Sequence, residues 1–203
     1  TPLGREQAKA AGMALSHVRF DRAVCSGYPR TRQTAELVLA QQAEPTPELQ
    51  VEPGLVEVHG GTVGEIRSRA DIAAKMAFHF DAAGEHDASL LPGGELFSDA
   101  MERSVAAVTR FLAEPDWHTM LIAAHEGINR LILGWASGGG LYAVRAFEQD
   151  TACINVLDFD LVPSAGDGVQ IERAMIKAVN LTPYNYVKHG MNMTSLEAIF
   201  TSD

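Results

Sequence analysis

A short apolar segment that leads straight into an amphipathic helix constrains the fold more than any other feature of this sequence. Residues Met120 to Ala124 are bulky and few enough to form a buried strand, and apolar residues then recur at helical spacing from Ile128 to Trp135. His125 lies between them, where a strand ends and a helix begins. In open α/β sheets ligands bind at that edge, and the amides of a helix N-terminus attract anions such as phosphate. A hydrogen-bonded core histidine is the alternative interpretation, and position alone does not separate the two.

The same strand–turn–helix pattern occurs earlier in the chain. Arg22 to Ser26 is a short apolar strand, Gly27 to Pro29 is a turn signal, and a helix is expected from about Thr31. Apolar spacing predicts further helices at about 3–15, 64–80, 93–112 and 141–147. Residues 152–159 and 169–179 are typical of a β-hairpin.

This alternation of strands and helices predicts an α/β protein. The expected architecture is a three-layer α/β/α sandwich whose sheet is mostly parallel, and the hairpin supplies an antiparallel edge. We expect a single domain over residues 1–203, with a C-terminal tail from about residue 180 that lies on the surface.

The composition of the chain limits the classes of partner that it can bind. The chain has 203 residues, a formal net charge of −10 and a pI of about 5.1. This balance argues against a nucleic-acid partner, and any anionic substrate must be held by a local cluster of Arg and His. No apolar run is long enough to span a membrane, and no secretory signal is expected. Cys25 and Cys153 lack metal-ligand spacing, so we expect two thiols, a reducing cytoplasm and no metal site.

Several polar residues fall on loops that would open at one edge of such a sheet. Arg30 stands where a turn becomes a helix, and its planar guanidinium suits phosphate oxygens. Glu57 lies between two valines, where apolar neighbours would raise its pKa and let it act as a general acid. His59 follows it, and Pro92–Glu95 precedes a helix. Each has an ordinary alternative: a solvated Arg, an edge carboxylate, an exposed loop His and a plain helix start.

These features occur together in a familiar order. Thr1 to Ala8 is similar to the motif "LTxxGxxQA", Ser26 to Ala35 to "SxLxRAxQTA", and Leu55–Glu57 with Gly61 to "LxE…G". Pro92–Glu95 with Arg103 is similar to "PGGES…R", and Ala124 to Arg130 to "SHGGxxR". From Thr1 to about Phe159 the chain therefore resembles the histidine phosphatase superfamily, whose fold is phosphoglycerate-mutase-like.

The resemblance implies hydrolysis of a small phosphomonoester through a phosphohistidine, with no metal or other cofactor. It implies catalytic roles for Glu57 as acid and base, for Arg30 as a phosphate ligand and for His125 as the second active-site histidine. We also predict substrate contacts from Ser26, His59, Glu126 and Gly127. The family's insertion, here at about 64–92, roofs the pocket and is expected to set specificity. A homodimer is left open by the sequence.

Two departures from the family pattern stand out. Glu126 replaces a motif Gly, which puts a carboxylate near an anion site unless it is paired, and Leu96 replaces the Ser of "GGES". The family's nucleophile belongs to an "RHG" segment at the end of the first strand. His17 lacks the following Gly, and His189 lacks a preceding strand. We therefore expect the nucleophile strand to lie upstream of Thr1.

Two other functions stay open at this point. A phosphoglycerate mutase is disfavoured, because the adjacent Arg pair expected of a mutase is not present between Gly64 and Phe80. A non-catalytic relative that binds a phosphorylated ligand or a protein partner is favoured by Glu126 and by the lack of an "RHG" segment.

Overall fold

A parallel sheet forms the centre of the molecule. The structure, a computed structural model, describes residues 1–62, 79–164 and 168–184. Strand β1 (Arg22–Cys25) lies between β2 (Leu49–Val51) and β3 (Met120–Ala123), and both neighbours run parallel to it. The two predicted strands at 22–26 and 120–124 are thus confirmed as direct neighbours.

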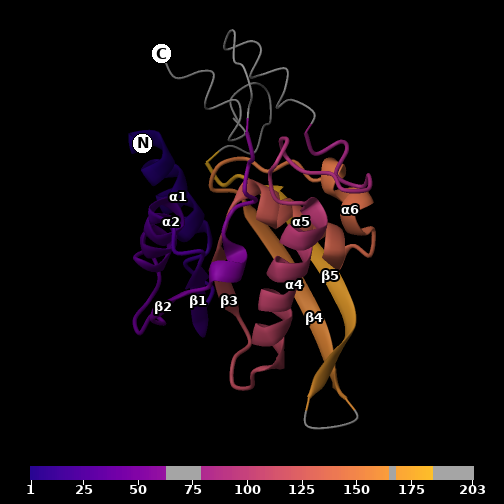
Figure 1. Ribbon diagram of the computed structural model, residues 1–203. Helices are drawn as coiled ribbons and strands as arrows, with labels where there is room; N and C mark the ends of the chain where they lie inside the picture. Colours follow the sequence, from indigo (N-terminus) through magenta and orange to yellow (C-terminus); the bar gives the residue numbers. More distant parts are fainter. Residues whose placement is uncertain (63–78, 165–167, 185–203) are drawn as a thin grey trace.

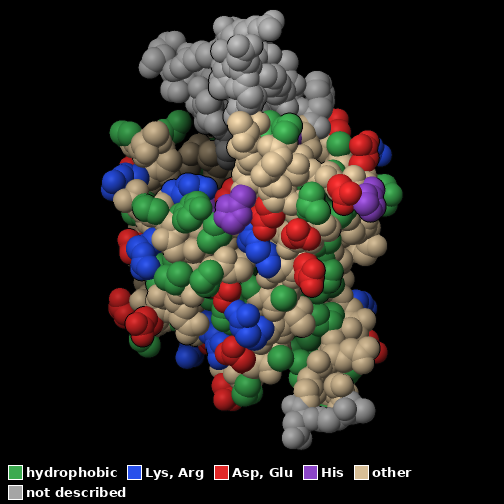
Figure 2. Space-filling view, in the orientation of Figure 1, with side chains coloured by type: hydrophobic (Ala, Val, Ile, Leu, Met, Phe, Trp, Pro, Cys, Tyr) green, Lys and Arg blue, Asp and Glu red, His purple; other side chains and the backbone are tan. Residues whose placement is uncertain are grey.

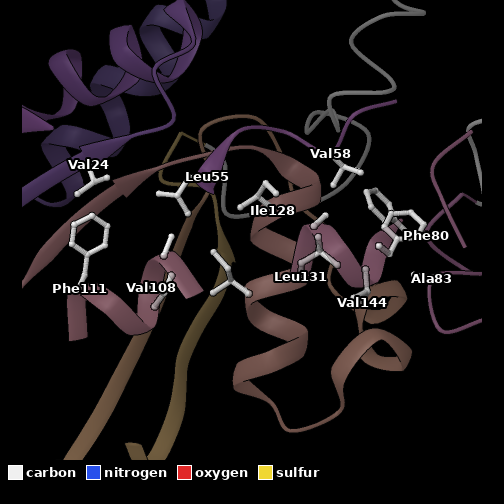
Figure 3. Packing of buried hydrophobic residues seen from close by; sticks show 14 of the residues in the cluster. Val24, Leu55, Val58, Phe80, Ala83, Val108, Phe111, Ile128, Leu131 and Val144 are labelled. Atoms are coloured by element: carbon white, nitrogen blue, oxygen red, sulfur yellow. The ribbon is translucent and has the colours of Figure 1, made fainter. Parts of the chain in front are cut away.

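Strand β1 is buried on both of its faces. Ala23 packs in a cluster with Ala11 and Val38, whereas the next residue, Val24, packs in a cluster with Phe111 (Figure 3). Successive side chains of a strand point to opposite faces, so the sheet must be covered on each side. This explains why the strand is a continuous apolar run.

Helices cover the two faces. Helices α1 (Pro2–Ala14) and α2 (Pro29–Leu39) pack together on one side, and α4 (Phe97–Ala113) and α5 (Glu126–Ala136) pack together on the other (Figure 1). The α/β class and the three-layer arrangement predicted from the sequence are confirmed.

A long antiparallel hairpin supplies the predicted edge. Strands β4 (Ile154–Pro163) and β5 (Val169–Leu181) form a two-stranded sheet of their own (Figure 1). Phe159 of β4 stacks on Trp135 of α5 with ring centroids 5.6 Å apart, which joins the hairpin to the helical layer. Between α5 and β4 the chain forms helix α6 (Gly140–Ala143) and the short 3-10 helix η2 (Val144–Ala146).

One predicted helix begins later than expected. The helix expected from about residue 93 begins at Phe97, and Gly93, Gly94 and Glu95 form a loop before it. Gly93 has a φ of +73°, which is outside helical geometry, and the Glu95 amide donates to the His59 carbonyl at 3.0 Å instead of to a helical carbonyl. The glycines therefore serve a tight turn against residues 59–61.

Two predicted regions lie mostly outside the described residues. Of the insertion at about 64–92, only residues 79–92 are described, and of the tail from about 180, only residues 180–184. The single-domain organisation with a cap stays a prediction. Among the described helices, none combines the length and the hydropathy needed to cross a membrane. Neither Cys25 nor Cys153 forms a disulfide among the described residues.

Candidate active site

The ends of β1 and β3 bring Ser26 and His125 together. Cys25 is level with Ala123 in the parallel register, so the residues that follow these strands leave the sheet at the same edge. The Ser26 hydroxyl lies 2.8 Å from Nε2 of His125. Both side chains are buried, with 3% and 5% of their residue surfaces exposed.

Arg30 reaches the same histidine from the first turn of α2. Its Nε–H donates to Nδ1 of His125 at 3.1 Å. Its guanidinium carbon lies 4.9 Å from the ring centroid of Tyr28, whose ring meets the edge of the His125 ring at 5.3 Å. Tyr28, Arg30 and His125 therefore form one cluster beside the N-termini of α2 and α5.

His125 is neutral at pH 7 in this arrangement. Burial lowers its pKa to about 4, and the positive charges of Arg30 and Arg103 act in the same direction. Nδ1 accepts a hydrogen bond from Arg30, so the proton of the neutral ring belongs on Nε2. An anion bound beside the ring would raise its pKa, since a neighbouring negative charge favours the imidazolium.

Glu57 faces the amino end of α5. Its Oε1 accepts from the Val58 amide at 3.0 Å, and its Oε2 accepts from the Gly127 amide at 3.4 Å. Burial raises its pKa, and the nearby charge of Glu126 adds to the effect, while the two amides and Arg30 oppose it. A carboxyl group with a raised pKa beside an anion site is suited to donate a proton.

An ion pair holds the loop that carries Glu57. Two nitrogens of the Arg103 guanidinium, Nε and Nη2, donate to the Glu95 carboxylate, at 2.6 and 2.8 Å. Arg103 also donates to the Gly54 carbonyl at 2.7 Å and to the Glu57 carbonyl at 3.4 Å, and the His59 amide donates to Glu95 at 3.1 Å. Glu95 and Arg103 thus fix the backbone on both sides of Glu57.

Glu126 is paired, which answers the concern raised by the sequence. Arg130, one helical turn later, donates to its carboxylate from NH2 at 2.9 Å. The Arg130 guanidinium also lies 4.5 Å from the ring centroid of Phe80, which belongs to the described part of the predicted cap. Arg130 therefore offsets part of the negative charge that Glu126 brings to the site.

Some of these residues line one cavity of about 1060 Å³. Its wall includes Arg30, Glu57, His125 and Glu126, together with the facing edges of β3 and β4. Charges of both signs are interspersed on the visible face of the molecule (Figure 2), so an anion depends on specific groups and not on a broad basic surface. Among the described residues, no cluster of His, Cys, Asp or Glu could hold a metal ion.

The predicted site residues divide into two groups. Arg30, Glu57 and His125 come together, with Ser26 and Gly127 in hydrogen-bond contact with His125 and Glu57. The His59 side chain is 67% exposed and lies beside Glu95 instead. The sequence-based site omitted four contributors, although each left a signal: Arg103 and Arg130 are the arginines of "PGGES…R" and "SHGGxxR", and Tyr28 and Thr31 depart from the Leu and Ala of "SxLxRAxQTA".

The sequence matches a known family and curated proteins. A family model described as the histidine phosphatase superfamily (branch 1) matches residues 1–162. The adenosylcobalamin/α-ribazole phosphatase of Escherichia coli K12 is 29% identical over 167 residues, which is 79% of each chain. The protein of the same name from Salmonella typhimurium is 29% identical over 162 residues, 78% of each chain.

Solved structures share the fold. A structure of a putative α-ribazole-5′-P phosphatase from E. coli K-12 superposes with a TM-score of 0.66 at 24% identity, over 89% of this chain and 82% of that one. A mycobacterial glucosyl-3-phosphoglycerate phosphatase, in complex with inorganic phosphate, gives a TM-score of 0.68 at 21% identity, over 91% and 88%.

Proposed function

The chain belongs to the histidine phosphatase superfamily, as its motifs predicted, and on that premise we propose that it hydrolyses a small phosphomonoester through a phosphohistidine intermediate without a metal ion. One observation carries the proposal. The Arg30 guanidinium, the His125 ring and the Glu57 carboxyl group, whose pKa is raised, line a single cavity at the carboxyl ends of parallel strands.

The phosphate group of the substrate would bind between Arg30 and His125. The Arg30 fork suits two phosphate oxygens, and in taking them it would release Nδ1 of His125. The dianion then favours protonation of Nδ1, so that His125 becomes a second cationic donor. Phosphoryl transfer needs positive groups around the equatorial oxygens, and these two side chains supply them.

Glu57 would act first as an acid and then as a base. Its raised pKa keeps a fraction protonated, and the proton passes to the oxygen of the leaving alcohol as the phosphorus–oxygen bond breaks. The resulting carboxylate then takes a proton from the water that attacks the phosphohistidine. The proton given in the first step is thus regained in the second, and the enzyme returns to its starting state.

The nucleophilic histidine would come from a strand between β3 and β4. These strands belong to separate sheets, and their facing edges line the cavity. A strand placed there parallel to β3 would end beside His125, because parallel strands share a carboxyl edge.

For the substrate, we propose α-ribazole 5′-phosphate as the first compound to test. The curated relatives carry names that include α-ribazole phosphatase, and the family match extends over most of this chain. Glu126 favoured a non-catalytic relative, but its pairing with Arg130 offsets part of its negative charge and so weakens that argument. We also propose that the predicted cap at about 64–92 sets specificity and that the protein works in the cytoplasm.

The test uses the complete natural protein with α-ribazole 5′-phosphate, p-nitrophenyl phosphate and 3-phosphoglycerate. We expect hydrolysis that EDTA does not change, an acid-labile phosphohistidine in rapidly quenched samples, and the highest kcat/KM for α-ribazole 5′-phosphate. Glu57→Gln should lower kcat far more on the poor leaving group of α-ribazole than on p-nitrophenol, which needs no protonation. Absence of phosphatase activity, or an EDTA-sensitive rate, would overturn the proposal.

A further inference from the structure

A chain of buried hydroxyl groups leads from His125 into the N-terminus of α2. Nε2 of His125 lies 2.8 Å from the Ser26 hydroxyl, which lies 2.8 Å from the Thr31 hydroxyl. The Thr31 hydroxyl donates to the carbonyl of Tyr28 at 3.0 Å. Only 3% of the surface of Thr31 is exposed, so water does not replace these contacts.

The direction of every hydrogen bond in this chain is determined. A hydroxyl has one hydrogen to donate, and that of Thr31 is used on the Tyr28 carbonyl. Ser26 must therefore donate to Thr31, and its oxygen is left to accept from Nε2–H of His125 and from the Tyr28 amide at 3.4 Å. From the other side, Arg30 donates to Nδ1.

We propose that Thr31 is a positioning residue which, through Ser26, keeps the permanent proton of His125 on Nε2 and leaves Nδ1 as the nitrogen that faces Arg30 and the substrate phosphate. This inference rests on the proposed function, since it assigns the atom of His125 that meets the phosphate. It also changes the role expected of Ser26 from a substrate contact to orienting His125 through Nε2.

Thr31 occupies a place where the motif "SxLxRAxQTA" has Ala. With Ala there, the Ser26 hydrogen has no acceptor on α2 and can turn to Nε2, which would place the ring proton on Nδ1 once Arg30 leaves for the phosphate. Nε2 would then accept from Ser26, and Nδ1 would present an N–H to the substrate whether the ring is neutral or charged. Thr31 removes that alternative.

The test compares Thr31→Val, which keeps the shape and removes the hydroxyl, with Thr31→Ser, which keeps the hydroxyl. Long-range 1H–15N spectra of the ring at pH 7, with and without inorganic phosphate, report which nitrogen carries the proton. In the parent and in Thr31→Ser we expect the neutral ring to carry its proton on Nε2 alone, both without and with phosphate. In Thr31→Val we expect the same form without phosphate, because Arg30 still donates to Nδ1, and a mixture of both neutral forms with phosphate, which draws Arg30 away. The kcat of Thr31→Val should be about fivefold lower, with KM within twofold of the parent.

Ser104→Ala is the matched control, because Ser104 is also a fully buried helical hydroxyl but bonds only the Met101 carbonyl at 3.1 Å among its described contacts. It should leave the His125 spectrum and kcat unchanged. Thr31→Ala serves as a second hydroxyl-free variant should valine prevent folding.

A single Nε2–H form with phosphate and a parental kcat in both hydroxyl-free variants would overturn the role of Thr31. The spectra do not depend on catalysis, so the two proposals fail separately. An inactive protein whose His125 loses its single form in Thr31→Val keeps the positioning role and loses the phosphatase assignment.

Discussion

Gly127 lies directly against the carboxylate of Glu57. Its amide donates to Oε2, and a Cβ atom at this position would lie 2.7 Å from Oε1 and 3.0 Å from a methyl carbon of Val58. Carbon atoms do not approach an oxygen that closely, so only glycine leaves the acid in its place. The position of Glu57 thus explains why the second residue after His125 is a glycine.

Gly127→Ala should therefore displace Glu57 and reduce the proton transfer to the leaving group. We expect a loss of about tenfold or more in kcat on alkyl phosphates, a smaller loss on p-nitrophenyl phosphate, and a cost in stability of about 1–3 kcal/mol from overpacking. Gly12→Ala is the control for overpacking, since its Cβ would lie 2.8 Å from Cγ of Gln41 and 2.9 Å from Cα of Val38 and would not meet Glu57. Equal losses on both substrates would contradict the explanation.

Arg103→Lys should lower kcat without removing any group that touches the substrate. Lysine cannot reproduce the two-pronged contact with Glu95 together with the bonds to the carbonyls of Gly54 and Glu57. We expect about 2 kcal/mol less stability in urea unfolding and a weaker preference for poor leaving groups. Arg110→Lys on the same helix, whose arginine is half exposed and pairs with Glu52, should change neither by much.

Stability should decrease as the pH falls from about 6.5 to about 4. The folded-state pKa of His125 lies below its ordinary value, so the neutral ring stabilises the fold above pH 6.5, and this contribution is lost as pH approaches 4. The raised pKa of Glu57 acts in the opposite sense, since its contribution is present at low pH and is lost as pH rises. In the difference between parent and His125→Gln, urea unfolding at pH 7 and pH 4 isolates the histidine, with an expected change of about 3 kcal/mol. Parallel pH dependence in both proteins would contradict the assignment.

Arg130→Met should harm both stability and substrate binding. Glu126 and Arg130 are 15% and 10% exposed, and removing one partner of a buried pair typically costs about 3 kcal/mol. The uncompensated carboxylate should also raise KM for phosphomonoesters severalfold by repelling the anion. Glu126→Gln in the same protein should restore KM, which a purely structural explanation does not predict. Lys9→Met, which breaks the exposed pair with Glu6, is the control and should cost under about 0.5 kcal/mol.

Much of the fold could be predicted because its elements carry strong local patterns. The segment from Met120 to Trp135 was assigned correctly as a strand, a turn and a helix, since burial on both faces makes a strand continuously apolar and burial on one face gives a helix its spacing. The start of α4 was placed wrongly, because Gly94 and Glu95 form long-range contacts with residues 59–61 that no local pattern contains.

The site was predictable as far as its residues belong to motifs. Arg30, Glu57 and His125 meet because register brings strand ends to one edge, and motif order already implied this. His59 also belongs to a loop near the site, but its direction depends on the Glu95–Arg103 pair, which turns it toward solvent. Thr31 and Arg130 belong to motifs, but their roles depend on contacts with Ser26 and Glu126 that only the three-dimensional structure reveals.

The burial of β1 on both faces has a consequence for hydrogen exchange. Ala23, Val24 and Cys25 of β1 lie between two packed helical layers and are paired with a strand on each side, so their amides should exchange only through global unfolding, and Ser26 follows the end of this strand. Glu57 belongs instead to a loop held by side-chain bonds, and such segments open locally at much lower free energy. The phosphate ligands and the proton donor thus belong to parts of the protein with different local stabilities, so the Glu57 loop should open while the strand that carries Ser26 stays folded.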